Sequence, residues 1–400
     1  MARVSTESKP PTTRQISRFL REGMTRSERE DFPTLFRHLK VSNYVDDRGQ
    51  VLHPTDRLAA HYERDGLVLF LGAGVSVDSG IPNWHDLAER VLCRSGITNS
   101  TLTYQVVERA FPTLISQFDL VAHKVGAAKL ITLIYECLYA NFSTAEMLMG
   151  IPGKNAEQVG WGGWRDIHSA LARNRTLKTV GDLLFDHSLE SARNRRIHSV
   201  ITVNSDNLLE LYCQARADGA RILTTVDRAS IGDHPDKISI YHLHGTLDAR
   251  KENFLRRENF PSDLLPDVVF TESQYYNTIA NPGSFVNHTP QSILRQHNVL
   301  FIGISLDDLN IRRWLHSSYQ QRVEHRTKYL REYYRKNYAA ASFQAEWDSM
   351  RHFWFRTMRE GLPQDEIELS MRKLGVQVIW CKDHAEARRH IRALTKVAVA

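Results

Sequence analysis

One short stretch constrains the fold of this chain more than any other: a buried-strand signature that is followed by glycines. Residues Leu67 to Leu71 form an uninterrupted apolar run, which is typical of a strand buried on both faces. The chain then continues with Gly72, Ala73, Gly74, Val75 and Ser76. Glycines at this place predict a tight turn that opens a helix, where bare backbone and its N–H groups can bind phosphate.

The turn differs from the dinucleotide fingerprint of dehydrogenases. In G-x-G-x-x-G the third glycine would fall at the position of Val77. That motif also needs an acidic residue about 20 positions further on, after a second strand. Here the segment from Asp86 to Arg94 has a helical pattern instead. The stretch therefore predicts a phosphate-binding turn of another kind.

Short apolar or β-branched runs recur along the chain and alternate with helical patterns. They are Ser199–Val203, Arg221–Val226, Lys237–Leu243, Asp267–Thr271, Asn298–Ile304 and Gly375–Trp380. Strands that alternate with helices predict a parallel sheet with helices on both faces. We therefore expect an α/β fold, a Rossmann-like doubly wound parallel sheet with helical insertions.

The domain organisation follows from the same patterns. Residues 1–55 are expected to form an N-terminal helical extension, with two helices between Ile16 and Leu39. Residues 56–400 then make one core with helical insertions at about 97–195 and 310–362. With 42% hydrophobic residues, the chain can bury a sizeable core.

Composition favours a soluble, cytoplasmic protein without a metal site. No apolar run reaches the about 18 residues that a membrane helix needs, and the N-terminus is polar. The cysteines Cys93, Cys137, Cys213 and Cys381 are scattered and form no C-x-x-C pair, which fits free thiols in a reducing compartment. The histidines lack metal-ligand spacing, so neither zinc nor magnesium is predicted.

Polar residues collect directly after the predicted strands. Asn204 and Asp206 follow the second strand, His244 follows the fourth, and Ser305 and Asp308 follow the run that begins at Asn298. The carboxyl ends of parallel strands share one edge, where ligands bind in such sheets. We therefore expect these side chains to converge on one site.

Each of these residues also has a purely structural interpretation. Asn204 alone more often caps a helix, and His244 alone is as often a satisfied core histidine. His242 is expected to be structural. The basic and tyrosine-rich run from Arg312 to Tyr338 suggests nucleic-acid contact, but a packed helical insertion that makes a subunit or partner interface explains it better.

The ordered set of motifs resembles the sirtuin family over about residues 60–310. Gly72–Ser76 with Ser79–Pro82 looks like the family's opening motif, and Thr202–Asp206 resembles its T-x-N-x-D element. His244-Gly245 is similar to its catalytic histidine–glycine pair. A later strand at Val268–Glu272 and a G-x-S turn at Gly303, Ile304 and Ser305 complete the likeness.

Departures from the family pattern narrow the resemblance. Sirtuins that deacylate proteins carry a four-cysteine zinc module, but Thr246 to Asp267 contains no cysteine and is too short for it. Asn83 and His85 stand where that branch has Asp and Arg. The sequence looks like the bacterial sirtuin-like branch that hydrolyses NAD in anti-phage defence, and this resemblance implies that Asn204 and His244 are the essential pair.

The resemblance implies an NAD+ hydrolase that releases nicotinamide and ADP-ribose and depletes NAD in abortive infection. NAD+ would be the substrate. Asn204, His244 and Asp206 would be catalytic: the amide can position a water or a ribose hydroxyl, and a histidine with its pKa near 6.5 can act as general base. The NAD-binding residues would be Gly72, Ala73, Gly74, Ser76, Pro82, Asn83, Gly303, Ser305 and Asp308.

Partners follow from the need to restrain such an activity. We expect a homo-oligomer and a separately encoded regulatory partner, because no sensor domain follows the predicted core; a HerA-type ATPase is the guess that the resemblance supplies. Two alternatives stay open: an NAD-dependent deacylase or ADP-ribosyltransferase, and a non-enzymatic scaffold that binds NAD or ADP-ribose.

Overall fold

The computed structural model describes most of the chain from residue 53 onward. The described residues are 53–142, 161–227, 236–249, 268–281, 283–333, 345–346 and 348–397. The helices expected between Ile16 and Leu39 lie outside them, so the N-terminal extension stays a prediction.

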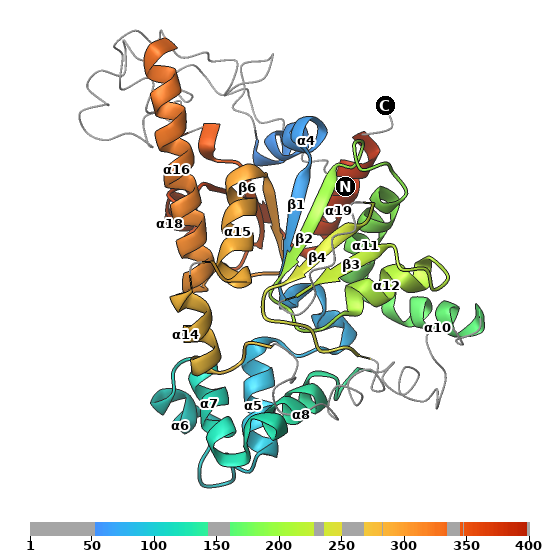
Figure 1. Cartoon of the computed structure of the whole chain (residues 1–400), viewed down its shortest axis with the longest axis vertical. Coiled ribbons are helices and arrows are strands. Elements are labelled where there is room, and N and C mark those ends of the chain that lie inside the picture. The colour runs from blue at the N-terminus through green and yellow to red at the C-terminus, as the bar shows by residue number, and fades with distance from the viewer. Residues whose placement is uncertain are drawn as a thin grey trace, which may run out of the picture.

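The core is a seven-stranded sheet in the order β3-β4-β2-β1-β5-β6-β7 (Figure 1). The strands are β1 (Leu67–Leu71), β2 (Ile197–Thr202), β3 (Leu223–Val226), β4 (Ile238–His242), β5 (Val299–Ile302), β6 (His352–Thr357) and β7 (Val376–Cys381). Every pairing of neighbouring strands is parallel. The strand order reverses at β1, which lies between β2 and β5, so the crevice for a ligand is expected at the carboxyl end of β1.

Helices cover both faces of the sheet, which confirms the doubly wound α/β fold. In β1, Leu67, Leu69 and Leu71 belong to one buried cluster, whereas Val68 and Phe70 belong to the other. The first face is covered by α4 (Pro54–Asp65), α11 (Arg175–Ser188), α12 (Leu208–Arg216) and α19 (His384–Val397). The second face is covered by α15 (Phe285–Gln296), α16 (Leu309–Tyr333) and α18 (Gln364–Arg372).

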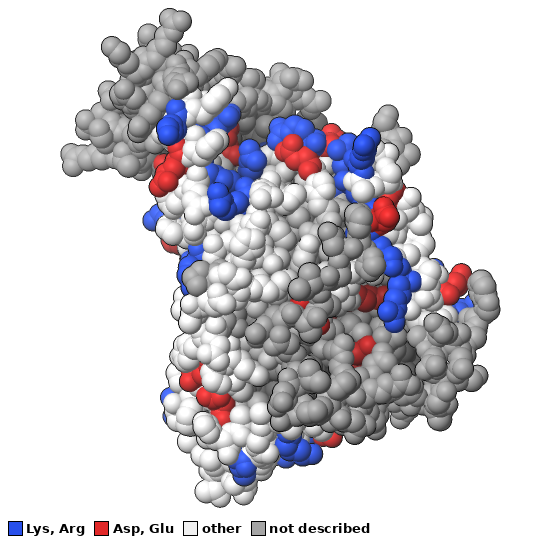
Figure 2. Space-filling model, viewed as in Figure 1, with Lys and Arg blue, Asp and Glu red and all other residues white. Residues whose placement is uncertain are grey.

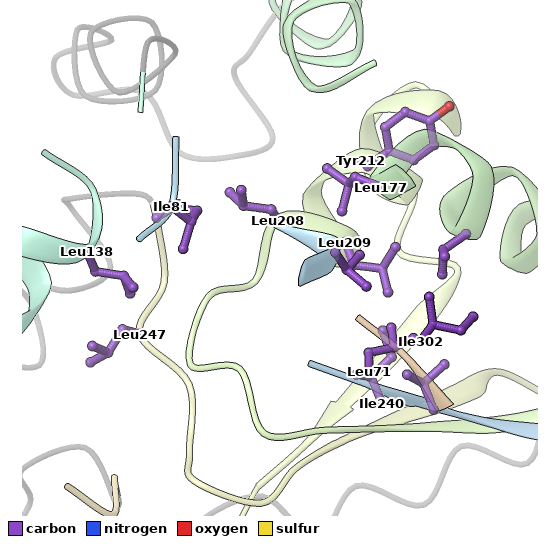
Figure 3. Packing of buried hydrophobic residues seen from close by; sticks show 14 of the residues in the cluster. Leu71, Ile81, Leu138, Leu177, Leu208, Leu209, Tyr212, Ile240, Leu247 and Ile302 are labelled. Carbon is purple, nitrogen blue, oxygen red and sulfur yellow. The ribbon is translucent and has the colours of Figure 1, made fainter. Parts of the chain in front are cut away.

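The first cluster continues from the sheet into its neighbouring helices. Leu71, Ile240 and Ile302, from three strands, lie close to Leu209 of α12 (Figure 3). All of these side chains are buried. The strands that carry the site are therefore anchored close to the edge where they end.

A helical lobe lies beyond the carboxyl ends of the strands (Figure 1). It consists of α5 (Trp84–Arg94), α6 (Tyr104–Ala110), α7 (Leu114–Val125) and α8 (Ala127–Leu138), and α5 packs on both α7 and α8. A further helix, α10 (Trp161–Leu171), packs on α12. The segment expected as a helical insertion at about 97–195 is thus helical where the structure describes it, apart from the turns between the helices.

The prediction of a strand at Asp267–Thr271 is wrong for its described residues. Val268, Val269 and Phe270 are buried but pair with no strand, and Thr271 is the N-cap of α14 (Glu272–Ala280). The apolar run has the composition of a strand because it is buried against the lobe, where Phe270 contacts Phe118 and Trp84. This segment is joined to the loop after β4, because the Val269 N–H donates a hydrogen bond to the His244 carbonyl at 3.1 Å.

The segment 310–362 is not wholly helical as expected. It contains most of α16, but it also contains β6, which pairs with β5 and β7. Phe353, Trp354 and Phe355 are buried because both faces of this strand are covered. The segment thus contributes a full strand to the core.

The glycine turn also differs from its prediction. Two short 3-10 turns, η2 (Ala73–Val75) and η3 (Val77–Ser79), follow β1. The α-helix α5 begins only at Trp84. Gly72 therefore does not lie at the N-terminus of an α-helix, and no helix dipole favours phosphate there. Elsewhere in the described residues, no helix is both long and apolar enough to cross a membrane.

Candidate functional site

The loops after β1 and β5 interlock at the point where the strand order reverses. The Gly72 N–H donates to the Ile302 carbonyl at 3.0 Å, and the Gly74 N–H donates to the Gly303 carbonyl at 2.9 Å. A Cβ on Gly72 would lie 2.6 Å from the Gly303 oxygen, and one on Gly74 would lie 2.8 Å from the Gly303 Cα. Gly303 itself has a φ of +68°. Glycine is needed at all three positions because the two backbones touch.

Most N–H groups of the glycine turn are already used inside the protein. Besides those of Gly72 and Gly74, the Val75 N–H donates to the Gly72 carbonyl and the Ser76 N–H to the Ala73 carbonyl. Within the described residues only the Ala73 N–H of this turn has no acceptor. The turn can therefore offer a ligand one backbone donor and a close approach to bare backbone, rather than a row of donors.

Asn204 lies in the loop after β2 and points at the glycine turn. Its side chain is buried, and its Nδ2 donates to the Gly72 carbonyl at 3.1 Å and approaches Ser76 Oγ at 3.5 Å. Its Oδ1 is shielded from solvent and has no partner among the described residues. A buried acceptor without a partner costs about 1–3 kcal/mol. The atom is therefore suited to accept a hydrogen bond from a ligand or a bound water.

Asp206 lies two residues further along the same loop. Its Oδ1 accepts hydrogen bonds from Ser76 Oγ at 3.0 Å and from the Leu208 N–H at 3.2 Å. Burial raises the pKa of this carboxyl to about 6, although those two hydrogen bonds oppose the shift. Asp206 is thus a mostly ionised but poorly solvated carboxylate at neutral pH. Ser76 is an internal link between the turn and this loop.

His244 follows β4 and lies at the same edge. The ring of Trp84 meets its imidazole edge-on, with the centroids 6.1 Å apart. Its Nδ1 is shielded and has no partner among the described residues. Burial lowers the pKa of His244, and the carboxylate of Asp308 opposes that shift. The imidazole is therefore neutral at pH 7 and can accept a proton.

A small pocket adjoins His244 on the side of α14 and α16. Its polar lining includes Asp308, Asn310 and Tyr275, whose hydroxyl accepts a hydrogen bond from Asn310 Nδ2. The free space is about 10 Å³, which is about the size of one water molecule. Asp308 also stabilises the start of α16, since its Oδ1 accepts from the Asn310 and Ile311 N–H groups.

Residues 198–354 match the family model of the SIR2-like domain. The matched segment begins in β2, contains Asn204, Asp206 and His244, and ends in β6. The match supports a sirtuin-like family, and SIR2-like domains are in general NAD-dependent enzymes. No curated protein matches the chain.

Other predicted site residues have local structural roles. Asn83 is the N-cap of α5: it accepts from the Asp86 N–H at 2.9 Å and donates to the Asp86 carboxylate at 2.8 Å. Pro82 is buried next to it. Ser305 is exposed at the end of the β5 loop and accepts from the Asp307 N–H at 3.4 Å. Their contacts with NAD+ stay predictions.

Two tyrosines of the helical lobe bind the loop that follows His244, and sequence reasoning missed both. The Tyr139 hydroxyl donates to the Leu247 carbonyl at 2.6 Å, and the Tyr135 hydroxyl donates to the Ala249 carbonyl at 3.3 Å. Leu247 in turn donates its N–H to the Ser205 carbonyl at 2.7 Å, between Asn204 and Asp206. The lobe and the loops after β2 and β4 are therefore joined by one chain of hydrogen bonds.

Glu210 was also missed, and it contacts the site through His242. Its carboxylate lies 2.7 Å from His242 Nε2, while His242 Nδ1 lies 2.9 Å from the Asn204 carbonyl. A signal was present in the sequence, because Glu210 stands one helical turn after Asp206. His242 has a structural contact, as expected.

The described part of the candidate site contains no cluster of metal ligands. Among the described residues, no group of three or more His, Cys, Asp or Glu side chains could hold a metal ion. Of the cysteines, Cys137, Cys213 and Cys381 are buried and Cys93 is exposed, and all four are free thiols.

Proposed function

We propose that this protein is an NAD+ hydrolase that cleaves the bond between nicotinamide and ribose. One observation carries the proposal. Two shielded polar atoms without partners, Asn204 Oδ1 and His244 Nδ1, come from loops that meet at the reversal point of a parallel sheet. A SIR2-like match over these loops supports NAD+ as the ligand that satisfies them.

The reaction makes a limited demand on the protein. The glycosidic C–N bond breaks, and nicotinamide leaves with the electron pair as a neutral molecule. The ribose carbon becomes oxocarbenium-like, and the Asp206 carboxylate can offset its positive charge. Water then adds to this carbon and loses a proton, which gives ADP-ribose.

Asn204 and His244 have different roles towards the attacking water: Asn204 positions it, and His244 takes its proton. Asn204 Oδ1 can accept a hydrogen bond from a ribose hydroxyl or from that water. His244 is neutral at pH 7 because burial lowers its pKa, so it can take the proton that the water loses. The small space beside His244 has room for one water molecule.

Nucleotide binding would use the interlocked loops. The Ala73 N–H is the donor of the glycine turn that is left for the pyrophosphate. Gly303 and Ser305 lie across from it on the β5 loop, where the adenosine half can bind. Asp308 lies nearer to His244 than to this half, because both line the small pocket.

The decisive experiment is incubation of the purified full chain with NAD+, followed by chromatography of the products. We expect equal amounts of nicotinamide and ADP-ribose without any acyl-peptide. Asn204→Ala and His244→Ala should lower the rate by at least about 100-fold. His198→Gln is the matched control, because His198 is exposed at the other end of β2.

The same assay tests the alternatives. Nicotinamide release that requires an acetylated peptide would indicate a deacylase, and a labelled protein product would indicate an ADP-ribosyltransferase. Cell toxicity and NAD loss that persist in both alanine variants would favour a non-enzymatic scaffold.

We further propose that the hydrolase acts in anti-phage defence and that assembly restrains it. Uncontrolled NAD cleavage would kill the host, so a homo-oligomer and a regulatory partner such as a HerA-type ATPase are expected. Light scattering and NAD assays with and without that partner test this proposal. A monomer that is fully active alone would contradict it.

A further inference from the structure

A buried ion pair lies directly behind Asn204. His242, at the end of β4, is 1% exposed, and its two ring nitrogens contact the Asn204 carbonyl at 2.9 Å and Glu210 Oε1 at 2.7 Å. The side chain of Glu210 is 14% exposed. The same Oε1 also accepts a hydrogen bond from Thr225 Oγ1 of β3 at 3.2 Å. Strands β3 and β4, the loop after β2 and α12 thus meet at this pair.

The partners decide the protonation state of His242. A carbonyl and a carboxylate both accept, so both ring nitrogens must donate, and only the imidazolium form can do that. Burial lowers the pKa of His242, but the Glu210 carboxylate and the two hydrogen bonds outweigh it and leave the pKa raised. Besides Glu210 from α12, the other charged group that faces His242 is Asp206, from the loop after β2, and it favours the same form.

We propose that His242, which Glu210 holds in place as a double donor, is a positioning residue whose bond to the Asn204 carbonyl fixes the backbone of Asn204 and so aims its carboxamide at the reacting ribose. The inference rests on the proposed NAD+ hydrolysis and names two further residues that serve it without touching substrate. Asn204 Nδ2 is held by the Gly72 carbonyl from the front, and its own carbonyl is held by His242 from behind. These two contacts fix the direction in which the free Oδ1 atom of Asn204 points.

Two variants of His242 separate positioning from simple stabilisation. The amide nitrogen of Asn can take the place of Nδ1, so His242→Asn keeps the bond to the Asn204 carbonyl but loses Glu210. The longer Gln reaches the place of Nε2, so His242→Gln keeps Glu210 and loses the Asn204 carbonyl. We expect kcat for NAD+ to fall about 10- to 100-fold in His242→Gln, with KM within about threefold. His242→Asn should retain most of kcat although it is the less stable variant.

A measurement on the wild-type protein does not depend on activity. Nitrogen-15 NMR of labelled histidine should show two N–H groups on His242 at pH 7, where an ordinary imidazole is mostly neutral, with the signal assigned by its loss in His242→Gln. The matched control is His187, which is 4% exposed, contacts Glu190 at 3.0 Å and Tyr62 at 2.6 Å, and lies away from the site. Glu190→Gln should leave kcat unchanged.

The outcomes are distinct. Equal loss of kcat in both His242 variants, or a neutral His242 at pH 7 in a protein that cleaves NAD+, would overturn the positioning inference and leave the hydrolase standing. A wild-type chain that cleaves no NAD+ but shows the imidazolium would overturn the proposed function and retain the ion pair. Retained kcat in His242→Asn with loss in His242→Gln upholds both.

Discussion

Asp206 is buried and yet ionised at neutral pH, two properties that usually exclude each other in a stable core. It is 6% exposed, and burial raises its pKa to about 6 from the ordinary value of 3.8. At neutral pH the native state therefore contains an ionised carboxyl group that water would solvate better in the unfolded state than the protein does in the folded state. A group of this kind destabilises the fold and is retained where its charge has a use.

Replacing the carboxyl by an amide should stabilise the protein. In Asp206→Asn the remaining oxygen can still accept from Ser76 Oγ and the Leu208 N–H, because both bond to Oδ1. The pKa of Asp206 is raised in the folded state, so ionisation of this carboxyl costs folding free energy. This cost is absent below about pH 4 and grows as the pH rises towards 6. We expect the free energy of unfolding in urea to rise by roughly 1–3 kcal/mol at pH 7.5 and to equal that of the wild type at pH 4.

The matched control has the opposite sign. The Arg64 guanidinium holds the pKa of Asp65 well below its usual range, so Asp65→Asn should destabilise the protein at pH 7.5. NAD+ cleavage should be lost in Asp206→Asn and kept in Asp65→Asn. A variant at Asp206 that is less stable at pH 7.5 would contradict this account.

The sequence could predict the members of the site but not their contacts. The rule that parallel strands share one carboxyl edge brings Asn204, Asp206 and His244 together, and the structure places them there. Which N–H groups of the glycine turn remain free depends on the β5 loop, whose approach no local pattern encodes. The partner of His242 likewise depends on how α12 packs across β4.

At the scale of elements, α8 is fastened to the loop that carries His244. The Tyr139 hydroxyl is the stronger of two such contacts, because it donates to a buried carbonyl at 2.6 Å. In Tyr139→Phe the Leu247 carbonyl loses this donor, at a cost of about 1–3 kcal/mol. We expect the Leu247 amide to exchange its hydrogen about tenfold faster. Hydrogen exchange followed by mass spectrometry measures this.

A second tyrosine of the lobe provides the control. The Tyr104 hydroxyl donates to Gln117 at 3.3 Å, so its bond lies within the lobe. Tyr104→Phe should leave exchange at Leu247 unchanged. Equal acceleration in both variants would mean that the lobe does not hold this loop.

Two elements show where composition misleads. The run Val268 to Phe270 is as apolar as a strand, yet it fills the space beneath the lobe, and Thr271 ends it by capping α14. The strand β6 lies in a basic, aromatic segment whose composition favours a helix, and its pairing with β5 and β7 makes it a strand. In both cases the tertiary partner, rather than the local residues, decides the conformation.

At the scale of the whole molecule, the sheet extends beyond the SIR2-like match. The match ends at residue 354, but β7 and α19 follow it and complete both cores. On the face shown in Figure 2, the described Lys and Arg side chains lie among Asp and Glu over several elements. These described side chains form no continuous basic stripe on that face.

Removing the last strand and helix should prevent folding. A chain that ends at Leu374 loses six buried apolar side chains: Val376, Val378, Ile379, Cys381, Ile391 and Leu394. At about 2 kcal/mol each, their loss is comparable to the total stability of a domain, about 5–15 kcal/mol. We expect no near-UV circular dichroism and rapid proteolysis, whereas a chain that ends at Val397 should behave as the wild type. A folded short chain would show that β7 is dispensable.

The interlock of Gly72, Gly74 and Gly303 has a consequence for the thermodynamics of binding. Because the two loops already touch and share hydrogen bonds, their backbone is ordered before any ligand arrives. The entropy cost of ordering these loops is part of the free energy of folding. Ligand binding therefore does not incur this cost, and affinity is not reduced by it. Binding at this edge should therefore resemble insertion into a preformed slot, and its dependence on temperature should reflect the ligand's own desolvation rather than loop closure.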